Sequence, residues 1–416
     1  MSPRSVSPEE CTLRGVRTRE EALAVADLYG KAFDGYEWHY KNYRDVMLRR
    51  VPREQWRLSR TLWSPDGEPV AQVRVCHRVM RLGAAKVRVG GIGDVCTHPF
   101  HRKQGLMRHL FAHVLEFLRE EPYDLSLLWG IPRFYDQFGF IAALDEGTLQ
   151  VPRRQVARLQ APLRGRNARR ADAPAIRRLF RADARSRDGA MDRPTDLWLK
   201  RAIRDRDIRV LADAQGRPAA YYRARPADDL ALLLDEVSLG ARPSGEGVVA
   251  VLADMAKVAK RHEKANLRFA LPPRHPIGRF LVADGCQVRR HTGHRGGAMA
   301  RIACLRTLCQ AMAGEWERLL AASPAAGWSG RLRLRAEPDT LDLAISEGRV
   351  EPVPKKGRAA ATITATQDKL ARLVLGFHSP GTAVWLGEAK ISRAARPLAE
   401  ALFPRRSLLI FPADHF

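Results

Sequence analysis

The segment VCTHPFHRKQGLMR, residues 95–108, decides how the first part of this chain folds. Pro99 cannot donate a hydrogen bond to a continuing ladder, so the apolar run before it predicts a strand that ends here. From Leu106 onward apolar residues recur at helical spacing, which predicts an amphipathic helix. The basic turn between the two elements therefore receives free N–H groups and the positive end of the helix, which predicts an anion site for a phosphate group.

Strand-like runs flank this segment on both sides. The apolar patterns at 69–80, 84–98 and 123–130 predict three strands, and a strong helix lies between the last two. Residues 14–30 predict a further amphipathic helix. Antiparallel strands followed by one crossover helix and another strand predict a mixed α/β layer.

The rest of the chain divides into two further sections. After an Arg-rich linker at 161–170, a helix from Asp172, strands at 208–213, 218–225 and 230–239, and a helix at 248–262 repeat the element order of the first section. From residue 303, a helix, a half-buried hairpin and a short helix predict a small α+β domain with a meandering sheet. The predicted domains are 1–155, 156–302 and 303–416, in an α/β class with mixed sheets.

Composition narrows the classes of partner. Lys and Arg number 71 against 46 Asp and Glu, a net charge of +25, but the Arg residues are scattered and lack the aromatic interleaving of a single-strand binder. This disfavours nucleic acid and suits a small polyanionic cofactor. No apolar run reaches the roughly 20 residues that span a bilayer, and the N-terminus lacks a signal-peptide core, so we expect a cytoplasmic protein and no membrane partner. The six cysteines form no CxxC pair, so we expect no metal site.

A tyrosine segment follows the basic turn by about 30 residues and adds a second signal. Residues 135–140 read YDQFGF, after the strand at 123–130. The pattern of a strand, P-x-x-R-x-x-G-[LI], a further strand and Y-x-x-x-G-F resembles the GCN5-related N-acetyltransferase (GNAT) superfamily. There the R-x-x-G loop wraps the pyrophosphate of coenzyme A. Met107 departs from the Gly or Ala that many members have at its position.

This resemblance implies an enzyme that uses acetyl-CoA as co-substrate. A strand that splays from its neighbour leaves backbone groups at 95–97 free for the pantetheine arm and the thioester oxygen. Tyr135, whose phenol is protonated at neutral pH, would donate a proton to the departing thiolate. The implied acetyl-CoA contacts are Val95, Cys96, Thr97, Arg102, Lys103, Gln104, Gly105, Leu106, Met107, Arg108, Gly130 and Ile131.

The three-section plan is similar to that of acetyltransferases of the enhanced intracellular survival (Eis) type. The shared segments are H-R-x-x-G-L-M-R from His101 and F-Y-x-x-F-G-F from Phe134, so Met107 becomes an expected residue. The resemblance implies a catalytic GNAT domain, a degenerate second GNAT domain, a sterol-carrier-protein-like third domain and homo-oligomers, hexamers in that family. It also implies that the carboxylate of the last residue, Phe416, is the general base.

Several alternatives stay open at this level. Asp94 and His98 are other candidates for the base. For the acceptor, the family implies amines of polycations such as aminoglycosides, or lysines; Asp34 and Glu37 are the candidate acidic contacts, though a solvated loop explains them equally well. A different class of function would be a lipid or apolar-ligand carrier that uses the C-terminal domain.

Overall fold

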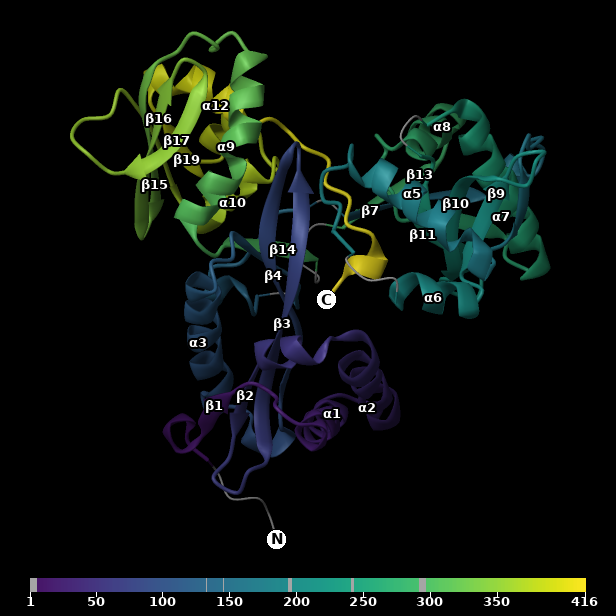
Figure 1. Cartoon of the computed structure of the whole chain (residues 1–416), viewed down its shortest axis with the longest axis horizontal. Helices are drawn as coiled ribbons and strands as arrows, with labels where there is room; N and C mark the ends of the chain where they lie inside the picture. The colour runs from purple at the N-terminus through teal and green to yellow at the C-terminus, as the bar shows by residue number, and fades with distance from the viewer. Residues whose placement is uncertain (1–5, 132, 145, 194–196, 241–242, 292–296) are drawn as a thin grey trace.

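Three units meet around the C-terminus in the computed structural model (Figure 1). The structure describes residues 6–131, 133–144, 146–193, 197–240, 243–291 and 297–416. The first and second units are seven-stranded sheets with helices, and the third is a five-stranded sheet with helices. The mixed α/β class expected from the sequence is confirmed.

The first sheet holds the segment that opened the sequence argument. Its strand order is β1-β2-β3-β4-β5-β14-β6, and β5 runs parallel to β4 whereas β3 runs antiparallel to it. Helix α3 (Leu106–Glu120) lies on one side of the long β3–β4 hairpin and helices α1 (Arg19–Ala32) and α2 (Tyr36–Asp45) on the other (Figure 1). The strands are β1 (Thr12–Arg14), β2 (Ser59–Trp63), β3 (Pro69–Leu82), β4 (Ala85–Thr97), β5 (Leu125–Trp129), β6 (Ile141–Ala142) and β14 (Ala298–Ile302).

The first two sheets exchange strands across the expected domain borders. Strand β7 (Glu146–Pro152) pairs with β12 (Asn266–Phe269) in the second sheet, and β14 pairs with β5 in the first. The order of the second sheet is β13-β7-β12-β11-β10-β9-β8. Its other strands are β8 (Arg164–Asn167), β9 (Ile208–Ala212), β10 (Pro218–Pro226), β11 (Ala231–Ser238) and β13 (Gln287–His291), and its helices are α4 (Arg153–Val156), α5 (Ala173–Ala184), α6 (Leu197–Arg204), α7 (Gly245–Arg261) and α8 (Pro276–Asp284).

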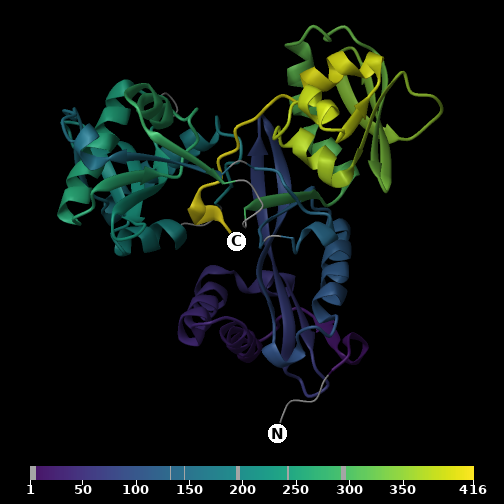
Figure 2. The same cartoon turned by 180° about the vertical axis from the view of Figure 1, so that it is seen from behind.

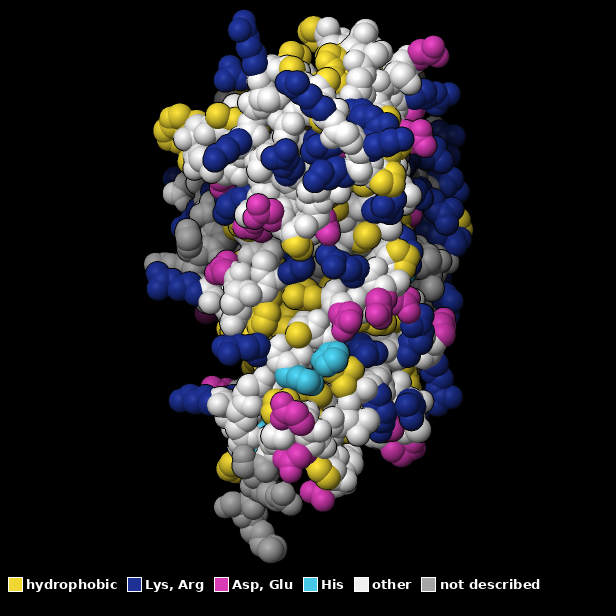
Figure 3. Space-filling view, turned by 90° about the vertical axis from the view of Figure 1, so that its left-hand side faces the viewer, with side chains coloured by type: hydrophobic (Ala, Val, Ile, Leu, Met, Phe, Trp, Pro, Cys, Tyr) yellow, Lys and Arg dark blue, Asp and Glu magenta, His cyan; other side chains and the backbone are white. Residues whose placement is uncertain are grey.

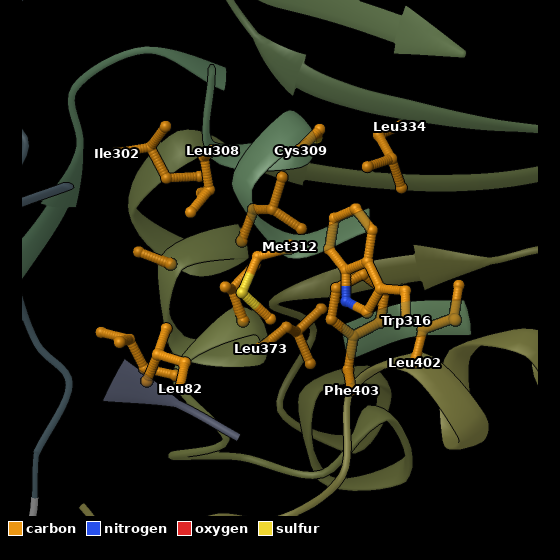
Figure 4. Packing of buried hydrophobic residues seen from close by; sticks show 14 of the residues in the cluster. Leu82, Ile302, Leu308, Cys309, Met312, Trp316, Leu334, Leu373, Leu402 and Phe403 are labelled. Atoms are coloured by element: carbon orange, nitrogen blue, oxygen red, sulfur yellow. The ribbon is translucent and has the colours of Figure 1, made fainter. Parts of the chain in front are cut away.

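The third unit shares its core with the first sheet. Met312 and Trp316 of helix α9 (Leu305–Ala321) belong to the same buried cluster as Val87 and Val89 of β4. Figure 4 shows the interior filled by interdigitating apolar side chains, with Trp316 beside Phe403. The strands are β15 (Gly330–Glu337), β16 (Asp339–Ser346), β17 (Arg349–Pro354), β18 (Ala361–Thr366) and β19 (Ala389–Ile391), and the other helices are α10 (Gln367–Val374), α11 (Pro380–Trp385) and α12 (Arg396–Leu402).

Most expected elements occur within a few residues of their predicted bounds. Helix α1 begins at Arg19 rather than residue 14, because the Thr18 side chain accepts a hydrogen bond from the N–H of Glu21 and caps the helix there. In the part of the chain that the structure describes, no helix is both long and apolar enough to cross a membrane. Figure 3 shows Lys and Arg side chains interspersed with acidic and apolar ones on one face of the molecule.

Candidate active site

The end of β4 separates from β5 and leaves a gap in the sheet. The two strands pair from Val89 with Leu125 to Ile92 with Leu128, and no pair is recorded beyond this point among the described residues. On its other edge β4 stays paired with β3 to Thr97, with one extra residue between Gly93 and Cys96. This bulge bends β4 away from β5. Backbone groups at 95–97 that face the gap can therefore bind an amide-bearing ligand.

The basic turn after β4 presents backbone donors. Gly105 precedes α3 in the left-handed conformation, with φ 81°, and Lys103 has φ 63°. The first bond of the helix runs from the N–H of His109 to the carbonyl of Gly105, so the N–H groups of residues 106–108 have no partner among the described hydrogen bonds. Lys103 and Arg108 are exposed beside them. This arrangement suits a diphosphate.

Two residues predicted to contact acetyl-CoA, Arg102 and Cys96, also make contacts within the protein. The guanidinium of Arg102 donates to the carbonyl of Ala32, which ties the turn to the end of α1. The Cys96 side chain packs with Leu28 and Ala32, and burial raises the pKa of its thiol. The described residues contain no group of three or more His, Cys, Asp or Glu side chains placed to hold a metal ion.

Substituting Gly105 tests the role of this turn. Gly105→Ala puts a Cβ at a positive φ, which costs about 1–2 kcal/mol in that backbone conformation, and we expect the KM for acetyl-CoA to rise about tenfold as the turn changes shape. Nothing lies within 4 Å of the new Cβ, so the effect would not come from a clash. Gly216→Ala, at φ 78° in the β9–β10 turn and equally open, is the control and should leave the KM unchanged. Equal effects in both variants would contradict a binding role.

Tyr135 lies in an aromatic cluster beside the end of β5. Its ring is 5.7 Å from that of Phe111 and 4.8 Å from that of Phe134, and a Cβ at Gly130 would stand 2.5 Å from the Tyr135 ring. Gly130 is thus needed for this close approach. Burial raises the pKa of Tyr135 to about 12, so the phenol stays protonated at neutral pH. Ile131 is exposed.

The C-terminal residue lies on β4, on the face opposite α3. A Cβ at Gly91 would stand 2.5 Å from the Phe416 ring, and a Cβ at Gly93 would stand 3.0 Å from the Phe416 carboxyl carbon. The Phe416 ring also lies 5.2 Å from that of Trp129 on β5. The chain end therefore reaches the strand that carries residues 95–97. Figure 2 shows the final segment running from the third unit to this central position.

Two contacts hold the end of the tail in place. The imidazole of His415 stacks on the Trp129 indole at 3.7 Å. Asp414 pairs with Arg193 at 2.7 Å, and Arg193 also pairs with Glu236 of β11 at 3.0 Å. Because these charges are buried in one network, removing one partner would leave another unpaired.

We expect Gly91→Ala to displace the tail without disturbing the acetyl-CoA turn. Overpacking at a close contact costs about 1–3 kcal/mol, and here this cost destabilises the docked position of the tail. We therefore expect kcat to fall about 5- to 150-fold, with little change in the KM for acetyl-CoA. Gly314→Ala, in α9 with open space around the new Cβ, is the matched control. Wild-type kcat in the Gly91 variant would show that the docked position is not needed.

His415 gives the tail a pH dependence. Burial lowers the pKa of His415 to about 4, below its ordinary value near 6.5. Between these values the unfolded chain binds a proton that the folded chain does not, so stability falls as the pH drops from about 6.5 towards 4. We expect the melting temperature of wild type to fall more between pH 7 and pH 5 than that of His415→Phe. Identical shifts would contradict this prediction.

The other candidate bases and the acidic contacts lie close to α1 and α2. The Asp94 carboxylate is ion-paired with the buried Arg74 guanidinium, so it is already engaged. Burial, followed by the charge of His101, lowers the pKa of His98. Asp34 is exposed between the helices, and Glu37 pairs with Lys41 at 3.0 Å on the surface of α2.

Sequence reasoning missed a group of aromatic rings near the end of β4. The Tyr29 ring lies 5.0 Å from that of Phe33 and 5.5 Å from that of His39, which Trp38 contacts in turn. Asp94 helps to raise the pKa of Tyr29, after burial, so these rings extend outward from the end of β4. The stretch FDGYEWHY at 33–40 carried the signal, but only its acidic residues were assigned a role.

Comparisons with known proteins match the first part of the chain to a known domain. Residues 17–143 match the family model of the acetyltransferase (GNAT) domain. A search of curated proteins found no significant match. The match to the family model assigns an acetyltransferase domain to residues 17–143 of the chain.

Solved structures share the whole fold at low identity. A GCN5-related N-acetyltransferase from Kribbella flavida has 18% identity and a TM-score of 0.73, with 99% of this chain and 100% of that one covered. One from Anabaena variabilis has 16% identity, coverage of 95% and 98%, and a TM-score of 0.73. Eis1 from Mycobacterium abscessus has 15% identity, coverage of 98% and 100%, and a TM-score of 0.67. At these identities the likeness establishes the fold.

Proposed function

We propose that the GNAT domain transfers the acetyl group of acetyl-CoA to a primary amine by direct attack in a ternary complex. The observation that supports this proposal is the placement of three features on the neighbouring strands β4 and β5: the gap between their ends, Tyr135 against Gly130 just after β5, and the Phe416 carboxyl carbon over Gly93 of β4. The amine must lose a proton, attack the thioester carbonyl carbon and expel the CoA thiolate.

The chain's own groups supply each part of this reaction. In the proposal, the Phe416 carboxylate accepts the amine proton and the Tyr135 hydroxyl protonates the departing sulfur. Backbone N–H groups at 95–97 stabilise the developing oxyanion, and the N–H groups of residues 103–108 hold the diphosphate. The remaining residues of the predicted contact set, Arg102, Gly130 and Ile131, are also proposed to contact acetyl-CoA.

The proposed acceptor is an aminoglycoside-like polyamine or a lysine side chain. Asp34 and Glu37 would contribute negative charge to the acceptor site. The Glu37 carboxylate also pairs with Lys41, and the Asp94 carboxylate pairs with Arg74. Exposed aromatic rings such as Trp38 can attract an ammonium group through cation–π contact, so they support amine binding as well.

A thiol-release assay tests the proposal directly. With acetyl-CoA, we expect aminoglycosides, polyamines or lysine peptides to increase thiol release well above hydrolysis without acceptor, and mass spectrometry should find the acetyl group on nitrogen. Failure of every amine to accelerate thiol release while acetyl-CoA binds would overturn amine acetylation. The packed interior of the third unit gives the lipid-carrier alternative no specific support.

The same resemblance carries further proposals about the whole chain. We propose residues 156–302 as the degenerate GNAT domain and 303–416 as the sterol-carrier-protein-like domain, with strands exchanged between the first two as described. We also propose that the protein is cytoplasmic and forms a homo-oligomer, which would be a hexamer as in the Eis type.

A further inference from the structure

A cationic cavity lies between α5 and the far end of the β3–β4 hairpin. Its volume is about 340 Å³. The segment after α5 is bonded to β3, because the N–H of Arg81 donates to the carbonyl of Ala190 and that of Gly189 to the carbonyl of Arg81, both at 2.9 Å. The cationic side chains among its described lining residues are Arg81, Lys86, Arg177, Arg181, Arg185 and Arg193.

Part of this positive charge has no carboxylate partner. Lys86 pairs with Asp192 at 2.8 Å, and Arg193 is engaged by Glu236 and Asp414. Within the described part of the chain, Arg181 and Arg185 form no ion pair. Arg181 lies in the last turn of α5 and Arg185 is the residue that follows the helix, so these like charges lie about one helical turn apart and repel each other. Both side chains are exposed, so solvent screens much of this repulsion, and a bound anion would pair with both guanidinium groups.

We infer that this cavity binds a small organic phosphate. Guanidinium groups bind phosphate oxygens through paired hydrogen bonds, which makes clustered arginines well suited to this group. The volume falls in the range of about 300–1,000 Å³ typical of small-molecule sites. None of the described lining residues belongs to the proposed acetyl-CoA or catalytic set, so this is a separate site.

The cavity is linked to the tail through Arg193. This side chain lies over the rings of Phe180 and Trp198, at 4.5 and 4.3 Å, and it pairs with Asp414, two residues before Phe416. An anion that stabilises the cavity walls therefore also keeps Arg193 in position to hold the tail. The effect on turnover rests on the proposed role of Phe416, whereas the binding itself does not.

Calorimetric titration of the full-length chain with inorganic pyrophosphate tests the binding site. Saturating CoA is present to fill the turn at 102–108. We expect one pyrophosphate per chain, with affinity at least about tenfold weaker in Arg181→Glu/Arg185→Glu. The control Lys257→Glu/Lys260→Glu makes the same change in net charge at a separate cationic groove and should bind as wild type.

Two results would overturn the inference that this cavity binds a phosphate. Absence of binding to wild type, or equal weakening in both double variants, would overturn it, the second because it indicates general attraction to a basic surface. If the Glu variant does not fold, Arg181→Gln/Arg185→Gln takes its place with the same expected direction.

The link to the tail has its own readout. Carboxypeptidase releases Phe416 only when the tail leaves β4, so we expect pyrophosphate to slow this release about threefold or more in wild type by mass action and not in Arg181→Glu/Arg185→Glu. Pyrophosphate binding without slower release would overturn the link while leaving the site. Neither assay uses an acceptor amine, so failure of the proposed acetyl transfer is detected separately.

Discussion

Adding one glycine after Phe416 is expected to lower kcat for acetyl transfer by about 10²–10⁴-fold, the usual worth of a positioned general base. The extension leaves the Phe416 ring free to pack on Gly91 but converts its carboxylate into an amide, which does not accept a proton at neutral pH. The new carboxylate would stand about 3.3–3.6 Å further along the chain. The structure places the present carboxyl carbon over Gly93, so this shift is large on the scale of the site.

Phe416→Tyr is the matched control, because it keeps both an aromatic ring and a terminal carboxylate. We expect it to retain kcat within about threefold, as a substitution that preserves the charged group. The KM for acetyl-CoA should change little in either variant, since the diphosphate turn is untouched. Wild-type kcat in the extended chain would exclude the carboxylate as the base, and Asp94→Asn and His98→Gln would then be the next variants to measure.

Local pattern was sufficient to predict most elements of the fold. The helical spacing from Leu106 to Leu118 and the strand stop at Pro99 both depend on residues adjacent in sequence, and both elements end within two residues of the prediction. Strand pairing depends on distant residues. Strand β14 begins 169 residues after β5 ends, and nothing in its composition indicates that it joins the first sheet.

The site was predictable to the same extent. The basic turn and Tyr135 belong to local motifs, so the sequence was sufficient to propose them as site residues. The GGIG run at 90–93 carries a signal that the sequence analysis did not use, because glycine weakens a strand interior and often marks a close approach of another group. The resemblance implies a role for Phe416, but its contact with Gly91 and Gly93 follows only from the folded chain. The pair of Arg193 and Asp414, 221 residues apart, has no sequence signal at all.

Replacement of Tyr135 by Phe is the second substitution for which we expect a large loss. It removes one hydroxyl and keeps the ring that packs against Phe111 and Gly130, so the fold and the KM for acetyl-CoA should be preserved. If the hydroxyl protonates the departing thiolate, kcat should fall by about 10²–10⁴-fold. Steady-state kinetics with one saturating amine measures this change.

Leaving-group chemistry separates an acid role from a packing role. A thiolate from a more acidic thiol leaves without protonation, so the ratio of wild-type to Tyr135→Phe rates should shrink when an acetyl aryl thioester replaces acetyl-CoA. The pKa of Tyr135, raised to about 12 by burial, also predicts that wild-type activity shows no loss from this group as the pH rises from 7 to 10, because the acid stays protonated. A loss in the Phe variant that is equal for both donors would contradict proton donation and leave Tyr135 as a core residue. A shrinking ratio together with a flat alkaline limb requires a proton from this hydroxyl, since no change in packing would depend on the acidity of the leaving thiol.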